Sequence, residues 1–371
     1  MRTVQHALPS SSSGLCRTLR SLHFGPARSG RKVYVQASLH ADEIPAMLVA
    51  QHLREQLLQL EAAGLIDGEI VLVPMANPIG LSQDLQGTLF GRFDLSTGVN
   101  FNRNYKHLTA PLLERLKGKL GSDAAANVEA IRAASRALLG EWEATTETEV
   151  LKKTLQTLAC DADIVLDLHC DNQAVLHLYT GTPLADQVMP LSAQIGAEAV
   201  LLARMSGDDP FDESLSRIWW ELAEQLPAHP IPNACVAITV ELRGETQVEH
   251  GLAEQDAAAL VAYLQQAGHI GGTPRAAPPA RCAATPLEGV EPIAAPHAGL
   301  LVFKKEPGEQ VQAGDVVVEL IDPNTDQRTE LKATVSGVLF ARVARRYASR
   351  GMRVAKIAGA KAFRSGKLLS M

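Results

Sequence analysis

Short, mostly apolar runs alternate with long helical patterns over the first 270 residues of the chain. The runs comprise residues 33–39, 70–73, 164–166 and 236–240. Because polar residues do not alternate within them, such runs are typical of strands buried on both faces of a mainly parallel sheet. Residues 45–60 and 123–158 have helical spacing, with a break in the second near Gly140. We therefore predict an α/β domain with helices flanking the sheet.

The pattern changes after residue 270. Residues 271–286 are rich in Gly, Pro and Ala without periodicity, as expected of a linker. Beyond them, short apolar segments at 299–303, 316–321, 335–343 and 354–357 are separated by Gly and Pro turns, with no helical stretch. We expect a domain at 1–270, a linker at 271–286 and a small all-β barrel-sandwich domain at 287–371.

Composition narrows the class of protein. The 371 residues are 46% hydrophobic and 20% charged with net charge -6, which excludes disorder over most of the chain. No apolar run approaches the ~20 residues that span a bilayer, and five cysteines without a CxxC pair indicate reduced thiols. We expect a cytoplasmic protein that binds neither membranes nor nucleic acid, since an acidic chain with 4% aromatic residues is a poor match for the latter.

Chemically versatile side chains follow the predicted strands. In open α/β sheets ligands bind outside the carboxyl ends of the strands. One strand is followed by His40 and Glu43, a second by His169, and a third by Glu241. Two His and one Glu form the ligand set of a catalytic zinc, with a fourth position left for water. The sequence thus indicates a zinc site built from His40, Glu43 and His169.

Each of these residues also has a plainer interpretation. An isolated HxxE is weak evidence, and His40 could simply satisfy a loop carbonyl at a strand end. Its position between a buried strand and a helix strengthens the zinc hypothesis. Asp167 could orient an imidazole from behind or belong to a surface turn, and we leave both open. For Asp171 we favour the surface turn.

Glu241 is the candidate general base. A carboxylate at the end of an apolar run is costly to bury without a partner or a role. Beside a zinc-bound water, it would accept a proton and pass it to the leaving group. The alternative is an ion pair with Arg243, which lies two residues away and therefore on the same face of a strand.

The densest polar cluster of the chain lies at residues 91–105. The planar guanidinium of Arg103 and the amide of Asn102 suit a substrate carboxylate. Arg92 could lie near the metal and stabilise the oxyanion formed on attack. The alternative is a turn-rich surface loop, because Gly, Asn and Asp are turn formers.

Together these residues resemble the succinylglutamate desuccinylase/aspartoacylase family of the zinc carboxypeptidase superfamily, over roughly residues 20–265. The matching pieces, in chain order, are His40-Ala-Asp-Glu43, Ala76-Asn-Pro78, Gly98-Val-Asn-Phe-Asn-Arg-Asn-Tyr105, Asp167-Leu-His169 and Thr239-Val-Glu-Leu-Arg243. The resemblance implies a zinc-carboxypeptidase-like fold with one Zn²⁺ per chain, held by His40, Glu43 and His169. It also implies Glu241 as general base, Asn102 and Arg103 as carboxylate binders, and Arg92 as the group that polarises the scissile carbonyl.

Two features depart from related patterns. Carboxypeptidases of this superfamily carry a Tyr shortly before the catalytic Glu, whereas residues 217–240 contain no Tyr, so the role of that Tyr is unassigned here. In the aspartoacylase branch the β domain can contribute a residue to the pocket, and Tyr347 is a candidate by its position. The β domain resembles biotinyl/lipoyl carrier modules but lacks their Met-Lys-Met element. We expect an unmodified domain that walls the active site and limits it to small substrates.

These observations predict a zinc-dependent amidohydrolase of the deacylase type, acting on an N-acylated amino acid or a similar small acyl amide. The same residues would serve a metallocarboxypeptidase that trims short peptides. A non-catalytic metal-binding protein with a partner is a third hypothesis, against which the complete ligand set counts. The acyl group, the amine and the choice between monomer and homo-oligomer stay open.

Overall fold

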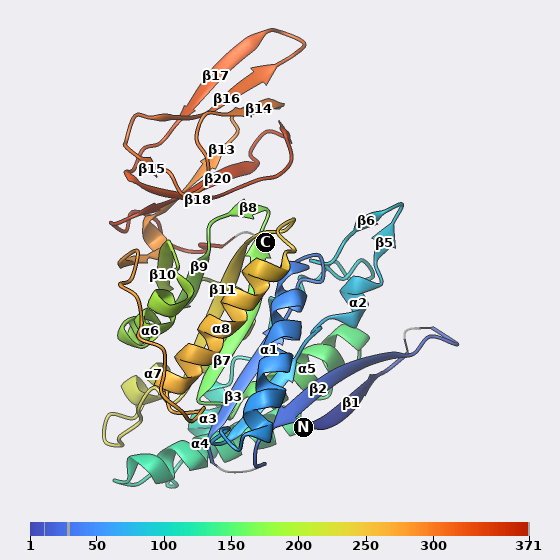
Figure 1. The fold of residues 1–371 in the computed structure, drawn as a ribbon, viewed down its shortest axis with the longest axis vertical. Helices are drawn as coiled ribbons and strands as arrows, with labels where there is room; N and C mark the ends of the chain where they lie inside the picture. Colours follow the sequence, from blue (N-terminus) through green and yellow to red (C-terminus); the bar gives the residue numbers. More distant parts are fainter. Residues whose placement is uncertain (11, 28–29, 370–371) are drawn as a thin grey trace.

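A computed structural model describes residues 1–10, 12–27 and 30–369. It contains an N-terminal α/β domain and a smaller β domain, which lies beyond one end of the N-terminal strands and is orange to red in Figure 1. The predicted fold class, a mainly parallel sheet flanked by helices with an all-β domain after it, is confirmed.

A nine-stranded mixed sheet forms the centre of the N-terminal domain, in the order β1-β2-β4-β3-β7-β11-β9-β10-β12. Five neighbouring pairs are parallel, and the pairs β1–β2, β2–β4 and β11–β9 are antiparallel. The strands are β1 (Arg2–Leu8), β2 (Arg17–Phe24), β3 (Lys32–Ala37), β4 (Glu69–Val73), β7 (Ile164–Asp171), β9 (His177–Gly181), β10 (Ala199–Ala203), β11 (Val236–Gly244) and β12 (Ala284–Pro286).

Helices cover both faces of this sheet. One face carries α1 (Pro45–Ala62), α6 (Ala185–Ile195) and α8 (His250–Gln266); the other carries α3 (Thr109–Arg115), α4 (Ala124–Gly140), α5 (Glu147–Ala159) and α7 (Phe211–Gln225). Successive residues of β3 divide between the two cores, with Val33 and Val35 in one and Tyr34 in the other. This two-sided burial explains the unbroken apolar runs. The predicted break near Gly140 separates α4 from α5.

The strands that carry the candidate site are neighbours. β7 lies between β3 and β11, and all three are parallel, so their carboxyl ends meet at one edge of the sheet. Glu241 of β11 is directly opposite His169 of β7 in the register. The turn that holds His40 and Glu43 joins β3 to α1 at the same edge, where the Ser38 amide donates to Leu168 O of β7.

The β domain consists of two antiparallel sheets that enclose a core of their own. One contains β13 (Val290–Ala294), β20 (Arg353–Gly359), β18 (Gly337–Arg342) and β15 (Gln310–Val311); the other contains β17 (Gln327–Lys332), β16 (Val316–Asp322), β14 (Gly299–Phe303) and β19 (Tyr347–Ala348). Leu320, Leu339 and Ile357 are fully buried between them.

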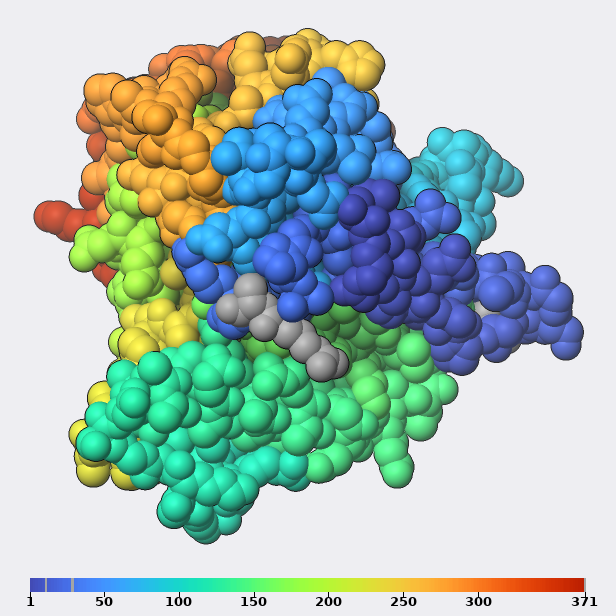
Figure 2. Space-filling view, turned by 60° about the horizontal axis from the view of Figure 1, so that its bottom comes forward, coloured from blue at the N-terminus to red at the C-terminus, as the bar shows by residue number. Residues whose placement is uncertain are grey.

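The chain passes between the two domains more than once. Directly after β7, the short strand β8 (Gln173–Ala174) pairs with β18 of the β domain. Residues 284–286, assigned to the linker from the sequence, form β12 and pair with β10. The preceding linker residues are mostly exposed and lie on the outer surface, in orange beside the blue α1, in Figure 2. None of the helices in the described residues is long and apolar enough to cross a membrane.

Candidate metal centre and active-site cavity

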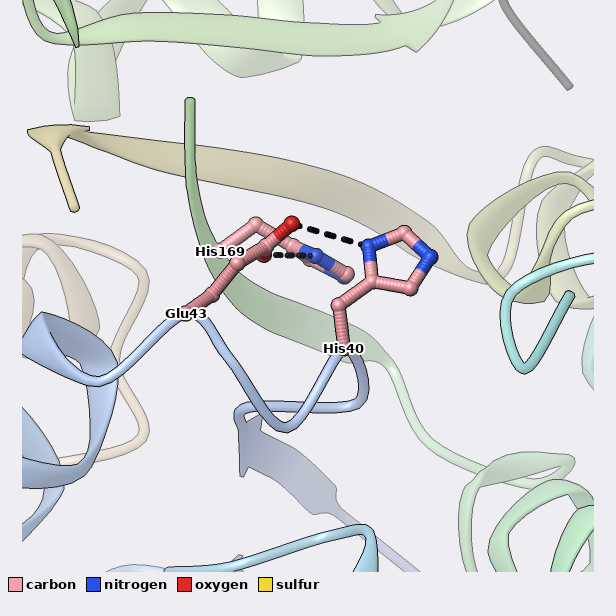
Figure 3. A group of neighbouring side chains, drawn as sticks. All are labelled: His40, Glu43 and His169. Atoms are coloured by element: carbon pink, nitrogen blue, oxygen red, sulfur yellow. Dashed lines mark hydrogen bonds and ion pairs between the residues drawn. The ribbon is translucent and has the colours of Figure 1, made fainter. Parts of the chain in front are cut away.

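Two histidines and a glutamate converge at the carboxyl end of the sheet (Figure 3). The Nδ1 atom of His40 lies 2.9 Å from Glu43 Oε1, and Nδ1 of His169 lies 2.7 Å from Glu43 Oε2. All three side chains are buried. Among the described residues they form the one group of three His, Cys, Asp or Glu side chains close enough to share a metal ion.

The local backbone brings His40 and Glu43 together. Ser38 has a positive φ of 57°, its amide donates to Leu168 O of β7, and its hydroxyl donates to Glu43 O. The Glu43 amide donates to His40 O, which closes the turn. The Cys170 amide donates to Glu43 Oε2 at 3.2 Å and ties the carboxylate to β7. The spacing of HxxE thus matches one tight turn pinned to the neighbouring strand.

The donor set fits a cation. Nε2 of His40 lies 2.9 Å from Asn100 Oδ1, and Nε2 of His169 lies 2.9 Å from Asp167 Oδ2. Because both partners are acceptors, they favour the Nε2–H tautomer, in which Nδ1 would be free to bind a cation beside the Glu43 carboxylate. Burial alone would lower the pKa of His169, but Asp167 and Glu43 raise it well above its usual value. Positive charge at this point therefore stabilises the arrangement.

Neither of the two aspartates beside His169 lies in a surface turn. Asp167 is fully buried, and its Oδ1 accepts a hydrogen bond of 2.8 Å from Gln36 Nε2 while its Oδ2 faces His169. Asp167 is therefore not in a surface turn, and its carboxylate lies beside the His169 ring, where it would orient the imidazole. For Asp171 the favoured surface turn is wrong: this residue ends β7 and pairs with Lys356 of the β domain.

All seven residues expected at the metal or the substrate line one cavity, with a volume of about 320 Å³. They are His40, Glu43, His169, Glu241, Arg92, Asn102 and Arg103. The β domain forms part of the same cavity, as expected of a domain that walls the site.

Glu241 faces this cavity without a hydrogen-bond partner in the described residues for its buried Oε2 atom. Burial, reinforced by the nearby charge of Glu43, raises the pKa of Glu241 to about 8. The ion pair with Arg243, considered as the alternative, is absent: Arg243 binds Asp256 through both terminal nitrogens, at 2.8 and 2.6 Å. Arg243 therefore does not neutralise the Glu241 carboxylate.

Arg92 reaches the metal ligands from a separate loop. Its Nη1 atom lies 3.3 Å from Glu43 Oε1, and its side chain is 37% exposed. The loop approaches the His40 turn so closely that a Cβ at Gly91 would lie 2.1 Å from the Asp42 nitrogen. Gly91 O accepts from the Ala41 amide at 3.0 Å. A residue with a side chain at position 91 would push Arg92 away from the site.

Asn102 and Arg103 are buried, which contradicts the alternative of an exposed turn-rich loop. Asn102 Oδ1 accepts from the Phe211 amide at the start of α7, and Asn102 Nδ2 lies 3.5 Å from His169 Nε2. Burial and the charge of Arg92 lower the pKa of Arg103. Lys152 of α5 donates to the carbonyls of Asn100 and Arg103, at 3.0 and 2.7 Å, and so fixes the backbone of residues 100–103.

Three residues of the site were not predicted from the sequence: Asn100, Tyr179 and Lys152. Asn100 stands two residues before Asn102 in the same polar segment, and that proximity was the available signal. Tyr179 of β9 lines the cavity, and burial together with Glu241 raises its pKa well above 10. Lys152 carried no recognisable motif. Tyr347, suggested by position, lies 41% exposed in β19 and is not among the residues that line the cavity.

Solved structures share this architecture over nearly the whole chain. A succinylglutamate desuccinylase/aspartoacylase family protein from Shewanella amazonensis SB2B is 26% identical, with 96% of this chain and 98% of that chain covered and a TM-score of 0.84. A protein of the same family from Shewanella frigidimarina NCIMB 400 is 24% identical, with 96% of this chain and 97% of that chain covered and a TM-score of 0.82. The ectoine utilization protein EutE (DoeB) from Ruegeria pomeroyi, 15% identical over 96% and 95%, has a TM-score of 0.65 and supports the fold.

No curated protein sequence matches the chain. The family model of the succinylglutamate desuccinylase/aspartoacylase catalytic domain matches residues 29–267. That span contains the converging His40, Glu43 and His169 as well as Glu241. The chain therefore belongs to the succinylglutamate desuccinylase/aspartoacylase family of hydrolases.

Proposed function

We propose that the protein is a cytoplasmic, zinc-dependent amidohydrolase that removes the acyl group from a small N-acylated amino acid. The observation that carries this proposal is Glu241, a half-buried glutamate whose buried Oε2 atom has no hydrogen-bond partner in the described residues, opposite His169 in the cavity of the candidate metal ligands. The five unpaired cysteines accord with a reducing compartment.

His40, Glu43 and His169 would hold the zinc ion. When bound, zinc acts as a Lewis acid that brings the pKa of a water ligand toward neutrality. Glu241 accepts a proton from the attacking water as the new carbon–oxygen bond forms at the amide carbonyl. It returns that proton to the amine nitrogen as the carbon–nitrogen bond breaks. The Arg92 guanidinium, beside Glu43, stabilises the negative charge on the carbonyl oxygen.

The charge of the cavity favours an anionic substrate. Its lining has five carboxylate side chains and five cationic side chains, so a divalent ion would make it net positive. Arg103 and Asn102 are buried and fixed, and a substrate carboxylate would meet their donors without a large loss of side-chain entropy. The cavity volume of about 320 Å³, with walls from both domains, suits a small acyl amide better than a peptide.

A panel of N-acyl amino acids, assayed with and without a chelator, tests the proposal. We expect hydrolysis that disappears with the chelator and returns with added Zn²⁺. Glu241→Gln should retain bound zinc and lose at least a hundredfold in kcat, because the amide cannot accept the proton. The exposed Glu254→Gln on α8 is the matched control and should behave as the parent. Parent-like turnover by Glu241→Gln, or faster cleavage of short peptides than of N-acyl amino acids, would overturn the proposal.

A further inference from the structure

The cavity has a second end that the proposed reaction does not use. It is lined by an apolar wall, which we define as Leu201 and Ala203 of β10, Leu287, Val290, Phe340 of β18, and Leu368 near the chain end. In the sheet, β10 is separated from the β7 strand of His169 by β11 and β9. At ~4.8 Å per strand, the apolar wall begins roughly 14 Å from the metal ligands.

Both domains contribute to this wall. Its members belong to a single buried cluster at the domain junction. Leu201 and Phe340 are completely buried there, whereas the other four are 4–5% exposed and present the surface that a ligand would meet. Of the cavity-lining cations Arg353, Lys356 and Arg364, two are engaged: Arg364 donates to the carbonyls of Val290 and Leu368 at 2.7 Å, and Lys356 pairs with Asp171. The six side chains of the wall offer a ligand no hydrogen bond, so they favour an apolar group over a polar one.

The segment at 360–369 fixes this end of the cavity. The Leu368 amide donates to Ser206 O at 3.0 Å, and Lys367 forms an ion pair of 2.7 Å with Asp208. Asp208 O in turn accepts from the Asn104 amide at 2.7 Å, directly after Arg103. The segment that places Leu368 on the cavity is therefore connected to the segment that carries the carboxylate-binding residues.

We propose that the apolar wall is a specificity subsite for an apolar substituent of the substrate, several carbons long or aromatic. This inference rests on the proposed function and names its substrate class: N-acyl amino acids with one carboxylate and one sizeable apolar group. The apolar group is either the acyl chain or the side chain of the amino acid. In both cases its burial removes hydrocarbon from water, so kcat/KM rises roughly three- to fourfold per methylene until the subsite is full.

Two substrate series separate these sources. In one, the acyl chain of an N-acylalanine grows from acetyl to hexanoyl. In the other, the acyl group stays acetyl and the amino acid is Ala, norvaline, Leu, Phe or Asp. We expect the stated rise in kcat/KM in one series, and N-acetylaspartate to be cleaved more slowly than N-acetylleucine. If kcat/KM is flat or falls with chain growth in both series, the subsite is refuted and the proposed function stands.

Variants locate the effect. Leu368→Ala should reduce the increment, that is, the rise in kcat/KM per methylene, at least twofold. Phe340→Ala should shift the preference of the enzyme to a substrate with a larger apolar group. Leu300→Ala, an exposed leucine of β14 outside the cavity, is the matched control and should keep the parental increment. Since Phe340 is fully buried, the melting temperature of each variant is measured beside kcat/KM. An unchanged increment in a folded Leu368→Ala would refute the assignment.

A binding assay keeps the subsite testable without turnover. Calorimetric titration of the zinc-loaded protein with acetate, butanoate, hexanoate and N-acetylated or free leucine and phenylalanine measures the same increment. If no substrate is hydrolysed but the longer ligands bind more tightly and Leu368→Ala removes the gain, the proposed function fails and the subsite stands. Equal affinity across both sets of ligands would refute the subsite.

Discussion

His177 should make the stability of this protein fall as the pH drops from 7 to 5. Its side chain is completely buried in β9, Nδ1–H donates to Val175 O at 2.8 Å, and Nε2 has no partner among the described residues. The ring packs on Phe340 of the β domain, with centroids 4.9 Å apart. Burial is the main cause that lowers the pKa of His177 to about 4, from 6.5.

The sign and size follow from proton linkage. In the folded protein His177 stays neutral until about pH 4, whereas in the unfolded chain it takes up a proton below about pH 6.5. Its neutral form therefore gives full stability above pH 6.5, and this stability is lost as the pH falls toward 4. At pH 5 the loss is about 2 kcal/mol, given 1.36 kcal/mol per pKa unit.

Replacement by glutamine isolates this effect, because the side-chain amide of glutamine can still donate to Val175 O and does not titrate. We expect the free energy of unfolding in urea, followed by tryptophan fluorescence, to fall by about 2 kcal/mol less between pH 7 and 5 for His177→Gln than for the parent. His229→Gln, at a partly exposed histidine, is the control and should keep the parental pH dependence. Equal pH dependence of parent and His177→Gln would refute the reasoning.

Three further predictions concern the metal and the substrate. His169→Ala should lose stoichiometric zinc, and mass spectrometry that finds one zinc per chain in this variant would remove His169 from the ligand set. Asn100→Ala should weaken zinc binding 10- to 100-fold in a chelator competition, because His40 loses the acceptor that orients it; unchanged affinity would count against this role. Lys152→Met should raise KM about tenfold with a smaller change in kcat, since the carbonyls of Asn100 and Arg103 lose their common donor. A change confined to kcat would contradict this role of Lys152.

The sequence predicted the centre of the fold and the metal residues because a simple rule connects them. Unbroken apolar runs mark strands that are buried on both faces, and polar residues at the ends of parallel strands gather at one edge. This rule placed His40, His169 and Glu241 together although they are far apart in the chain. The rule requires only that the strands are parallel, and the order of the strands in the sheet does not have to be known.

The remaining features depend on contacts that local pattern does not encode. β1 and β2 form an edge hairpin with one partly exposed face, so their apolar residues are interrupted by polar ones. The wall of the cavity depends on how the β domain docks, which brought Phe340 rather than Tyr347 to the site. Asp171 resembled a turn residue because its partner, Lys356, lies in the other domain.

The short strand β8 limits what the β domain can do. Only a few residues lie between His169 and Gln173, and four residues can span at most about 14 Å. A swinging motion of the β domain would pull on the strand that bears a metal ligand, so this domain is anchored and cannot travel between distant partners as a carrier module does. For the same reason, an insertion between β7 and β8 should be poorly tolerated.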